Sequence, residues 1–133
     1  MTRLSLLAAL FLVAGPAFAL EPLASERHIN DSLRAGRIGD VIRKTCPTIK
    51  ARMFVVMAKV DDLKSYALKK GYSRDEVEAF LKDPAQKNRL KAEAAAWLKA
   101  QGAVEGNTES YCRVGEAEIA RGSLVGSLLR STR

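Results

Sequence analysis

Two cysteines, Cys46 and Cys112, constrain the fold of this 133-residue chain more than any other feature of its sequence. In an oxidising compartment, two lone cysteines in a small domain form a disulfide, and two allow one intramolecular pairing. The bond would close a loop of about half the chain, and the loop-entropy model assigns roughly 4 kcal/mol to such a ring. Whether the bond forms depends on where the protein resides.

The N-terminal segment indicates export. Arg3 supplies a short cationic start, and Leu4–Val13 is an unbroken apolar run. Ala17 and Ala19 place small residues at the two positions that a signal peptidase recognises. The apolar run is shorter than the ~20 residues that a membrane anchor needs. We therefore expect cleavage between Ala19 and Leu20, a periplasmic protein that does not span the membrane, and oxidised cysteines.

The chain divides into a signal peptide, residues 1–19, and a single domain, residues 20–133, whose apolar residues recur at helical spacing. The clearest helix is expected to open at Pro47 and to stop at Gly71. Its predicted buried stripe consists of Ile49, Met53, Val56, Val60, Leu63 and Ala67. No stretch predicts a strand. We expect an all-α fold, a small bundle of about five helices stapled by one disulfide.

Capping residues mark the later helix boundaries. Ser73 and Glu76 have the spacing of a capping box. Asp83 followed by Pro84 predicts the start of the next helix. A last helix is expected to begin near Thr108 and to run past the final glycines.

Glycines qualify this helical prediction. Gly36 and Gly39 are expected to interrupt the first helical stretch. Gly115, Gly122 and Gly126 lie within the predicted last helix, where each costs about 1 kcal/mol relative to alanine. Their spacing favours close contact between helices over a phosphate-binding loop.

The titratable residues form no pattern typical of catalysis or metal binding. His28, the one histidine, has polar neighbours and is expected on a solvated helix surface. A general base needs an orienting partner, and none is indicated. The adjacent Asp61 and Asp62 would point about 100° apart on a helix. Heme attachment and zinc are excluded because the required Cys and His spacings are missing. We expect a non-enzymatic protein without a cofactor or metal.

Basic residues flank the first cysteine, in a chain with a net charge of +7. They form a candidate docking face, made of Arg43, Lys44, Lys50 and Arg52. Export and the lack of interleaved aromatic residues argue against nucleic acid as the partner. An anionic membrane surface or an acidic protein face fits better, and a merely solvated surface is the alternative. A docking face requires that these side chains project to one side and stay unpaired by local carboxylates.

Three stretches carry a resemblance to a known family, namely the run from Ile38 to Met53, the triplet Gly71-Tyr72-Ser73 and the run from Glu109 to Ser123. They resemble an uncharacterised family of small exported alphaproteobacterial proteins. The resemblance covers essentially all of residues 20–133 and implies that both cysteines belong to the family pattern. It implies no activity and no catalytic residue. Through gene neighbourhood it implies an accessory or assembly role for the respiratory NADH–quinone oxidoreductase.

The sequence thus favours a periplasmic helical protein that binds another protein or a membrane-associated complex. The alternatives are the oxidoreductase accessory role, a periplasmic stress chaperone and a small-ligand or lipid carrier. A carrier would need an apolar cavity, whereas a helical stripe of apolar residues is more typical of a packed core. That stripe comprises Met53, Val56, Val60, Phe80 and Trp97. A closed, packed centre would exclude the carrier.

Overall fold

The computed structural model describes residues 19–133, and the predicted signal segment, apart from Ala19, lies outside the described residues. The elements in chain order are the 3-10 turn η1 (Leu23–Ser25), α1 (Arg27–Thr45), β1 (Ile49–Ala51), α2 (Met53–Lys70), α3 (Arg74–Lys82), α4 (Pro84–Ala100), α5 (Thr108–Arg121), α6 (Leu124–Ser127) and β2 (Leu129–Ser131). This order confirms the predicted helical bundle, to which a very small sheet is added.

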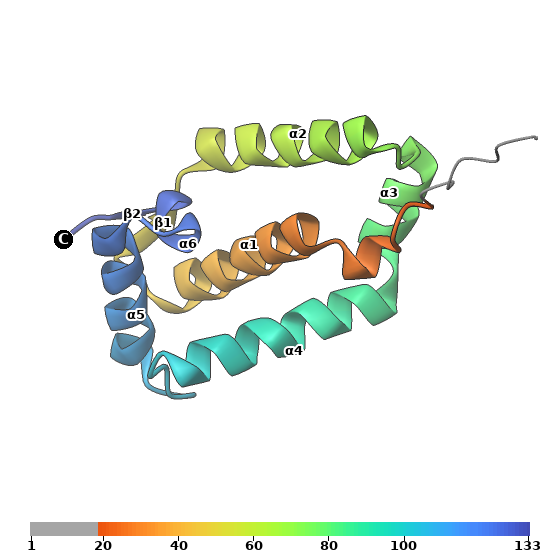
Figure 1. Ribbon diagram of the computed structural model, residues 1–133. Coiled ribbons are helices and arrows are strands. Elements are labelled where there is room, and N and C mark those ends of the chain that lie inside the picture. Colours follow the sequence, from red (N-terminus) through yellow and green to blue (C-terminus); the bar gives the residue numbers. More distant parts are fainter. Residues whose placement is uncertain (1–18) are drawn as a thin grey trace, which may run out of the picture.

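Helix α1 lies at the centre of the molecule, with α4 along one side and α5 and α6 at its C-terminal end (Figure 1). The main core surrounds this end, where Ile38 and Ile42 are completely or almost completely buried. Leu98 of α4 and Val125 of α6 complete the core from opposite directions. The middle of the molecule is therefore organised by one helix rather than by a symmetric bundle.

The predicted interruption of the first helix is wrong, because α1 runs without a break through Gly36 and Gly39. Ile38 and Ile42 lie on either side of Gly39 and face the core. Burying an isoleucine side chain stabilises a fold by roughly 1.5–3 kcal/mol. This gain exceeds the cost of about 1 kcal/mol for each glycine, so the helix continues.

A two-stranded antiparallel sheet corrects the expectation that the chain has no strand. β1 pairs with β2, and Lys50 lies opposite Arg130 at the middle of the ladder. Pro47 consequently belongs to a turn and does not open a helix. Ile49, expected on a helix, is a fully buried strand residue. Strands of three residues are too short to show the alternation by which a sequence predicts a strand.

Helix α2 stands apart from the core along most of its length (Figure 1). Ala67 is its one buried residue. Met53 and Val60, which were expected to be buried, are 56% and 45% exposed. The helical period was predicted correctly, and Ile49 and Ala67 of the stripe are buried, but the prediction that Met53 and Val60 pack into the core is wrong.

A smaller apolar cluster fastens the far end of α2 to the start of α1. Ile29 of α1, Ala67 of α2 and Tyr72 are its buried members, and Phe80 of α3 packs against them. Gly71 ends α2 in the left-handed conformation, with φ of 111°. Helix α2 is thus held at its two ends and spans the space between them.

The capping predictions are confirmed at both sites. Ser73 and Glu76 form the capping box of α3, with each side chain accepting a hydrogen bond from the other residue's backbone amide. The side chain of Asp83 accepts a hydrogen bond from the Ala85 amide and caps α4.

The predicted last helix is divided, because Gly122 ends α5 in the left-handed conformation with φ of 64°. Two other glycines do permit close packing, as predicted. A Cβ atom at Gly115 would overlap the side chain of Ile49, and one at Gly126 would overlap the backbone of Glu118. Helix α6 therefore lies directly against the end of α5.

Candidate functional site

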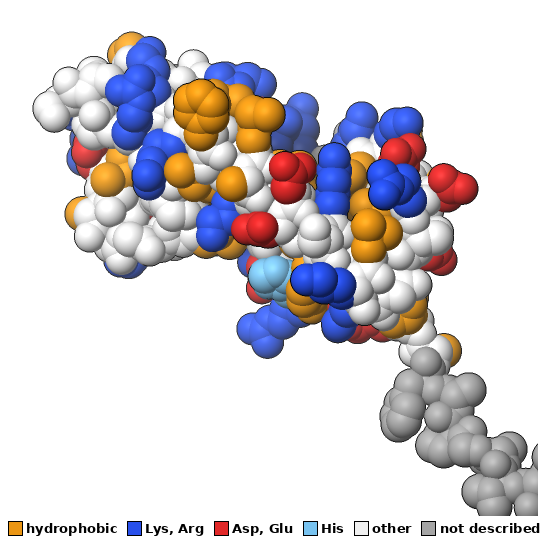
Figure 2. Space-filling model, turned by 90° about the horizontal axis from the view of Figure 1, so that it is seen from above, with side chains coloured by type: hydrophobic (Ala, Val, Ile, Leu, Met, Phe, Trp, Pro, Cys, Tyr) orange, Lys and Arg blue, Asp and Glu red, His pale blue; other side chains and the backbone are white. Residues whose placement is uncertain are grey.

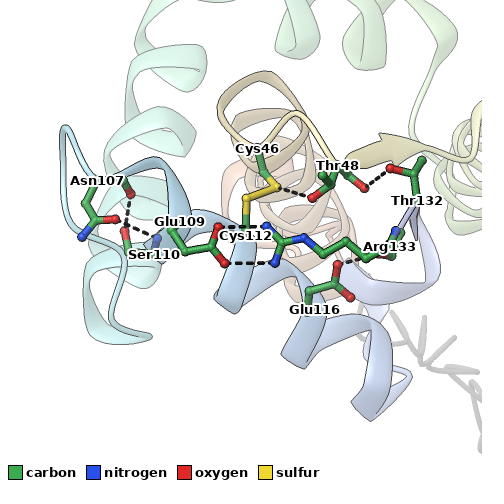
Figure 3. Close-up of a disulfide and its surroundings, with 10 residues drawn as sticks. Cys46, Thr48, Asn107, Glu109, Ser110, Cys112, Glu116, Thr132 and Arg133 are labelled. Atoms are coloured by element: carbon green, nitrogen blue, oxygen red, sulfur yellow. Dashed lines mark hydrogen bonds and ion pairs between the residues drawn. A yellow bond between two sulfur atoms is a disulfide. The ribbon is translucent and has the colours of Figure 1, made fainter.

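The predicted disulfide between Cys46 and Cys112 is present, with the two Cα atoms 5.1 Å apart (Figure 3). Cys46 caps the C-terminus of α1, and Cys112 lies in the first half of α5. Both cysteines are buried. The bond is therefore a structural link, and it is consistent with an oxidising compartment.

The predicted basic cluster is split by the fold. Arg43 and Lys44, in the last turn of α1, both pair with Asp40, at 2.6 Å and 2.8 Å. Partial burial would raise the pKa of Asp40, but hydrogen bonds and charges from Lys44 and Arg43 hold it below its usual value. These two side chains do not meet the requirement that a docking face be unpaired by local carboxylates.

Lys50 and Arg52 have no carboxylate partner among the residues that the structure describes and meet that requirement. Lys50 projects from β1 beside Arg130 of β2, and both side chains belong to exposed residues. Arg52 precedes α2 and donates a hydrogen bond to the carbonyl oxygen of Ser127, at 3.2 Å. The sequence analysis missed Arg130, because strand pairing alone brings it beside Lys50. The sequence did contain one indication of Arg130, because the chain has no acidic residue after Glu118 that could pair with it locally.

A groove of about 810 Å³ is bordered by α1, α2, α3, α4 and α6. Its apolar lining is contributed by Leu33, Val56, Val60, Leu63, Leu81, Leu90, Leu124 and Leu128. The sequence analysis missed this groove because it placed Val56 and Val60 in a packed core. The volume lies within the range that binding pockets commonly have. The groove lies outside the packed main core, and the small-ligand or lipid carrier stays a hypothesis.

Basic side chains from three helices border the same groove. Arg37 comes from α1, Lys59 from α2, and Lys87 and Lys91 from α4. Within residues 19–133 none of the four lies within 4.0 Å of a carboxylate oxygen, and Asp62 is the one carboxylate in the lining. The Nε atom of Arg37 is buried without a hydrogen-bond partner in this part of the chain. The groove is thus apolar inside and positive at its edge.

Glu26 connects α1 and α2 at one end of the groove. Its carboxylate accepts hydrogen bonds from the Ile29 amide at 2.6 Å, the Tyr66 hydroxyl at 2.8 Å and the Lys70 ammonium at 3.2 Å. Burial would raise the pKa of Glu26, but these bonds outweigh it and hold the pKa below its usual value near 4.5. His28 is exposed, as expected, and its ring centre lies 4.4 Å from that of Tyr66. These contacts fix the distance between α1 and α2, which form two walls of the groove.

No group of three or more His, Cys, Asp or Glu residues in residues 19–133 is placed to hold a metal ion. Over the same residues, no helix combines the length and the apolar character needed to cross a bilayer.

Residues 21–130 match the model of a family described as a family of unknown function (DUF5333). The chain belongs to this family. The match confirms the resemblance to an uncharacterised family and includes both cysteines, the groove, β1 and the first two residues of β2. No curated protein and no solved structure matches the chain. Family membership assigns no activity to the chain. The groove and the exposed basic side chains are the features that bear on its function.

Proposed function

We propose that this protein is an exported, non-enzymatic binding protein of the periplasm, and that its groove holds an acidic amphipathic segment of a partner protein. One observation supports this proposal above all. The groove combines an apolar lining with four basic side chains that have no carboxylate partner among the described residues. An amphipathic helix with apolar residues on one face and acidic residues beside them complements both properties.

The distribution of charge favours a polypeptide over a small anionic ligand. The basic groups come from three different helices. Lys87 and Lys91 are four residues apart on α4, which separates them by about one helical turn. A lipid headgroup or a small acid would neutralise one such group, whereas several acidic side chains along a segment would pair with all of them.

The compartment supports the same proposal. The disulfide fits an oxidising space, and the N-terminal pattern is that of a cleaved secretion signal. A subunit or assembly intermediate of the respiratory NADH–quinone oxidoreductase would be one such partner, as the family resemblance implies. A stress chaperone has no specific support in the groove.

Site-specific photo-crosslinking tests the proposal in the cell envelope of the source organism. A photoreactive residue at Val60, inside the groove, should crosslink to a peptide that is acidic and amphipathic. A photoreactive residue at Val104, which is 56% exposed on the α4–α5 loop, is the matched control. Lipid adducts at Val60 would favour the carrier instead, and equal crosslinking at both positions would contradict a groove site.

The captured segment then allows a direct affinity measurement. A synthetic peptide of its sequence should bind the purified protein less tightly as salt rises, because exposed charges are screened over about 8 Å at physiological ionic strength. Lys87→Glu with Lys91→Glu should weaken binding, whereas Lys69→Glu with Lys99→Glu, outside the groove lining, should not. Equal affinity of both double variants would exclude the basic edge from binding.

A further inference from the structure

A second surface combines apolar and basic side chains at the junction of α2 and the two-stranded sheet. We call it the α2–sheet patch, and it consists of Met53, Phe54, Met57, Lys50, Arg52 and Arg130. Phe54 is 92% exposed, Met57 60% and Met53 56%. Large apolar side chains exposed together in this way indicate a surface that contacts something.

The α2–sheet patch is separate from the groove. Successive residues of a helix are about 100° apart around its axis. By this spacing, Phe54 lies about 120–160° around α2 from the groove-lining Val56 and Val60. Met57 lies about 60–100° from them and Met53 about 20–60°, so the patch borders the groove at Met53 and faces away from it at Phe54. None of the three is part of the groove lining. Both surfaces can therefore be occupied at the same time.

The chain segments that form the patch carry charge of one sign. Residues 47–60 and 119–133, which form the sheet, α6 and the first part of α2, contain no Asp or Glu. Figure 2, which looks down on α2, shows orange apolar and blue basic side chains together toward the end that bears the sheet, with most red acidic side chains farther along. Lys50 and Arg130 are also cross-strand neighbours. Like charges in that position repel, and a bound anion would relieve the repulsion.

We propose that the α2–sheet patch docks on the surface of an anionic phospholipid bilayer. Phe54 inserts at the level of the headgroups, and Lys50, Arg52 and Arg130 lie against the phosphates. A protruding aromatic ring surrounded by cations suits a bilayer, because lipid headgroups move aside where a folded protein would need a preformed pocket. The attachment leaves the groove open, so it goes beyond the function proposed above.

Vesicle co-sedimentation tests the proposal with residues 1–19 removed, because the apolar run in that segment would itself bind lipid. The probes are vesicles of phosphatidylglycerol mixed with phosphatidylcholine, and vesicles of phosphatidylcholine alone. The protein should bind the anionic vesicles and lose binding at high salt. It should not sediment with the neutral ones. Each basic residue near an anionic surface contributes a factor of about five to binding, so Lys50→Glu with Arg130→Glu should weaken it at least tenfold.

Matched variants separate the patch from general charge and hydrophobicity. Phe54→Ser should weaken vesicle binding several-fold, whereas Val104→Ser, at another exposed apolar residue, should not. Lys69→Glu with Lys99→Glu has the same net charge as the patch variant and should keep most of the binding. In Phe54→Trp, the added tryptophan emission should shift to shorter wavelength with anionic vesicles only.

Several results would overturn the proposal. These are failure of the unchanged protein to bind anionic vesicles, equal binding to neutral vesicles, or equal losses in patch and control variants. Circular dichroism of each variant checks folding, and Phe54→Trp keeps the test valid if a charge reversal disturbs the sheet. The groove variant Lys87→Glu with Lys91→Glu should retain most vesicle binding, which distinguishes failure of this proposal from failure of the groove proposal.

Discussion

At the scale of single residues, three glycines show how one residue type has opposite effects on stability. Gly36 lies in α1, and a Cβ atom there would meet nothing within 4 Å. Gly115 lies close to the side chain of Ile49, and Gly126 lies close to the backbone of Glu118. At Gly126 the obstacle is the backbone of Glu118, which cannot rotate away as a side chain can. The same substitution to alanine should therefore change stability in opposite directions.

We predict that Gly36→Ala raises the free energy of unfolding by about 0.5–1 kcal/mol, because alanine restricts the unfolded chain and fits an open helical position. Gly126→Ala should lower it by roughly 1–3 kcal/mol or more, because α6 must move away from α5. Chemical denaturation followed by circular dichroism measures both changes. A Gly126→Ala variant as stable as the unchanged protein would show that α6 does not pack on α5 as described.

At the scale of elements, the position of α2 depends on a few contacts at its ends. Arg52 bonds to the Ser127 carbonyl at the start of the helix, and Tyr66 and Lys70 bond to Glu26 near its end. Between these points α2 forms one wall of the groove. A change at Glu26 therefore loosens the groove without touching its lining.

We predict that Glu26→Gln lowers the free energy of unfolding by about 1 kcal/mol at neutral pH, since the charged cap of α1 is lost. The pKa of Glu26 is lowered by folding from a value near 4.5, so its ionised form stabilises the fold above that pH. This stabilisation is lost as pH falls through the lowered pKa. The difference between Glu26→Gln and the unchanged protein should therefore shrink below about pH 4.5. A difference that stays constant down to pH 2 would contradict the role of the charge.

The elements also show which features a sequence can predict. Capping sites such as Ser73 and Asp83 were predicted because their signal lies within a few neighbouring residues. The apolar stripe of α2 was recognised, but periodicity does not tell whether a core or a groove faces it. The sheet joins residues near 50 and 130, and strands of three residues give no period. Lys50 and Arg52 were named from the sequence, but the groove and the placement of these two residues beside Arg130 depend on distant segments and emerged from the structure.

At the scale of the whole molecule, residues just after the predicted cleavage site contact the rest of the domain. The Tyr72 hydroxyl donates a hydrogen bond to the carbonyl oxygen of Glu21, at 2.7 Å. The side chain of Leu20 lies beside Gly71. The segment that follows the predicted signal thus contacts the turn between α2 and α3, at the end of the molecule opposite the disulfide (Figure 1).

We predict that the native protein begins at Leu20. Intact-mass spectrometry of protein isolated from the source organism measures this directly, and N-terminal sequencing checks the first residues. Retention of Met1 or Thr2 would contradict export, and it would remove the argument from compartment for the disulfide.

The disulfide fastens the end of α1 to α5, so its loss should weaken the whole body rather than one helix. Removing a link across 66 residues should lower the free energy of unfolding by roughly 4 kcal/mol in the loop-entropy model. This is a large share of the ~5–15 kcal/mol typical of a domain.

Thermal melting with and without a reductant measures the loss, and Cys46→Ala with Cys112→Ala should melt at one temperature under both conditions. Two free thiols in the denatured, unreduced native protein would contradict the bond. β1 begins three residues after Cys46 and pairs with β2, so the reduced protein should retain helix α5 while the two-stranded sheet loosens first. Hydrogen exchange at β2, compared between the oxidised and reduced forms, tests that order.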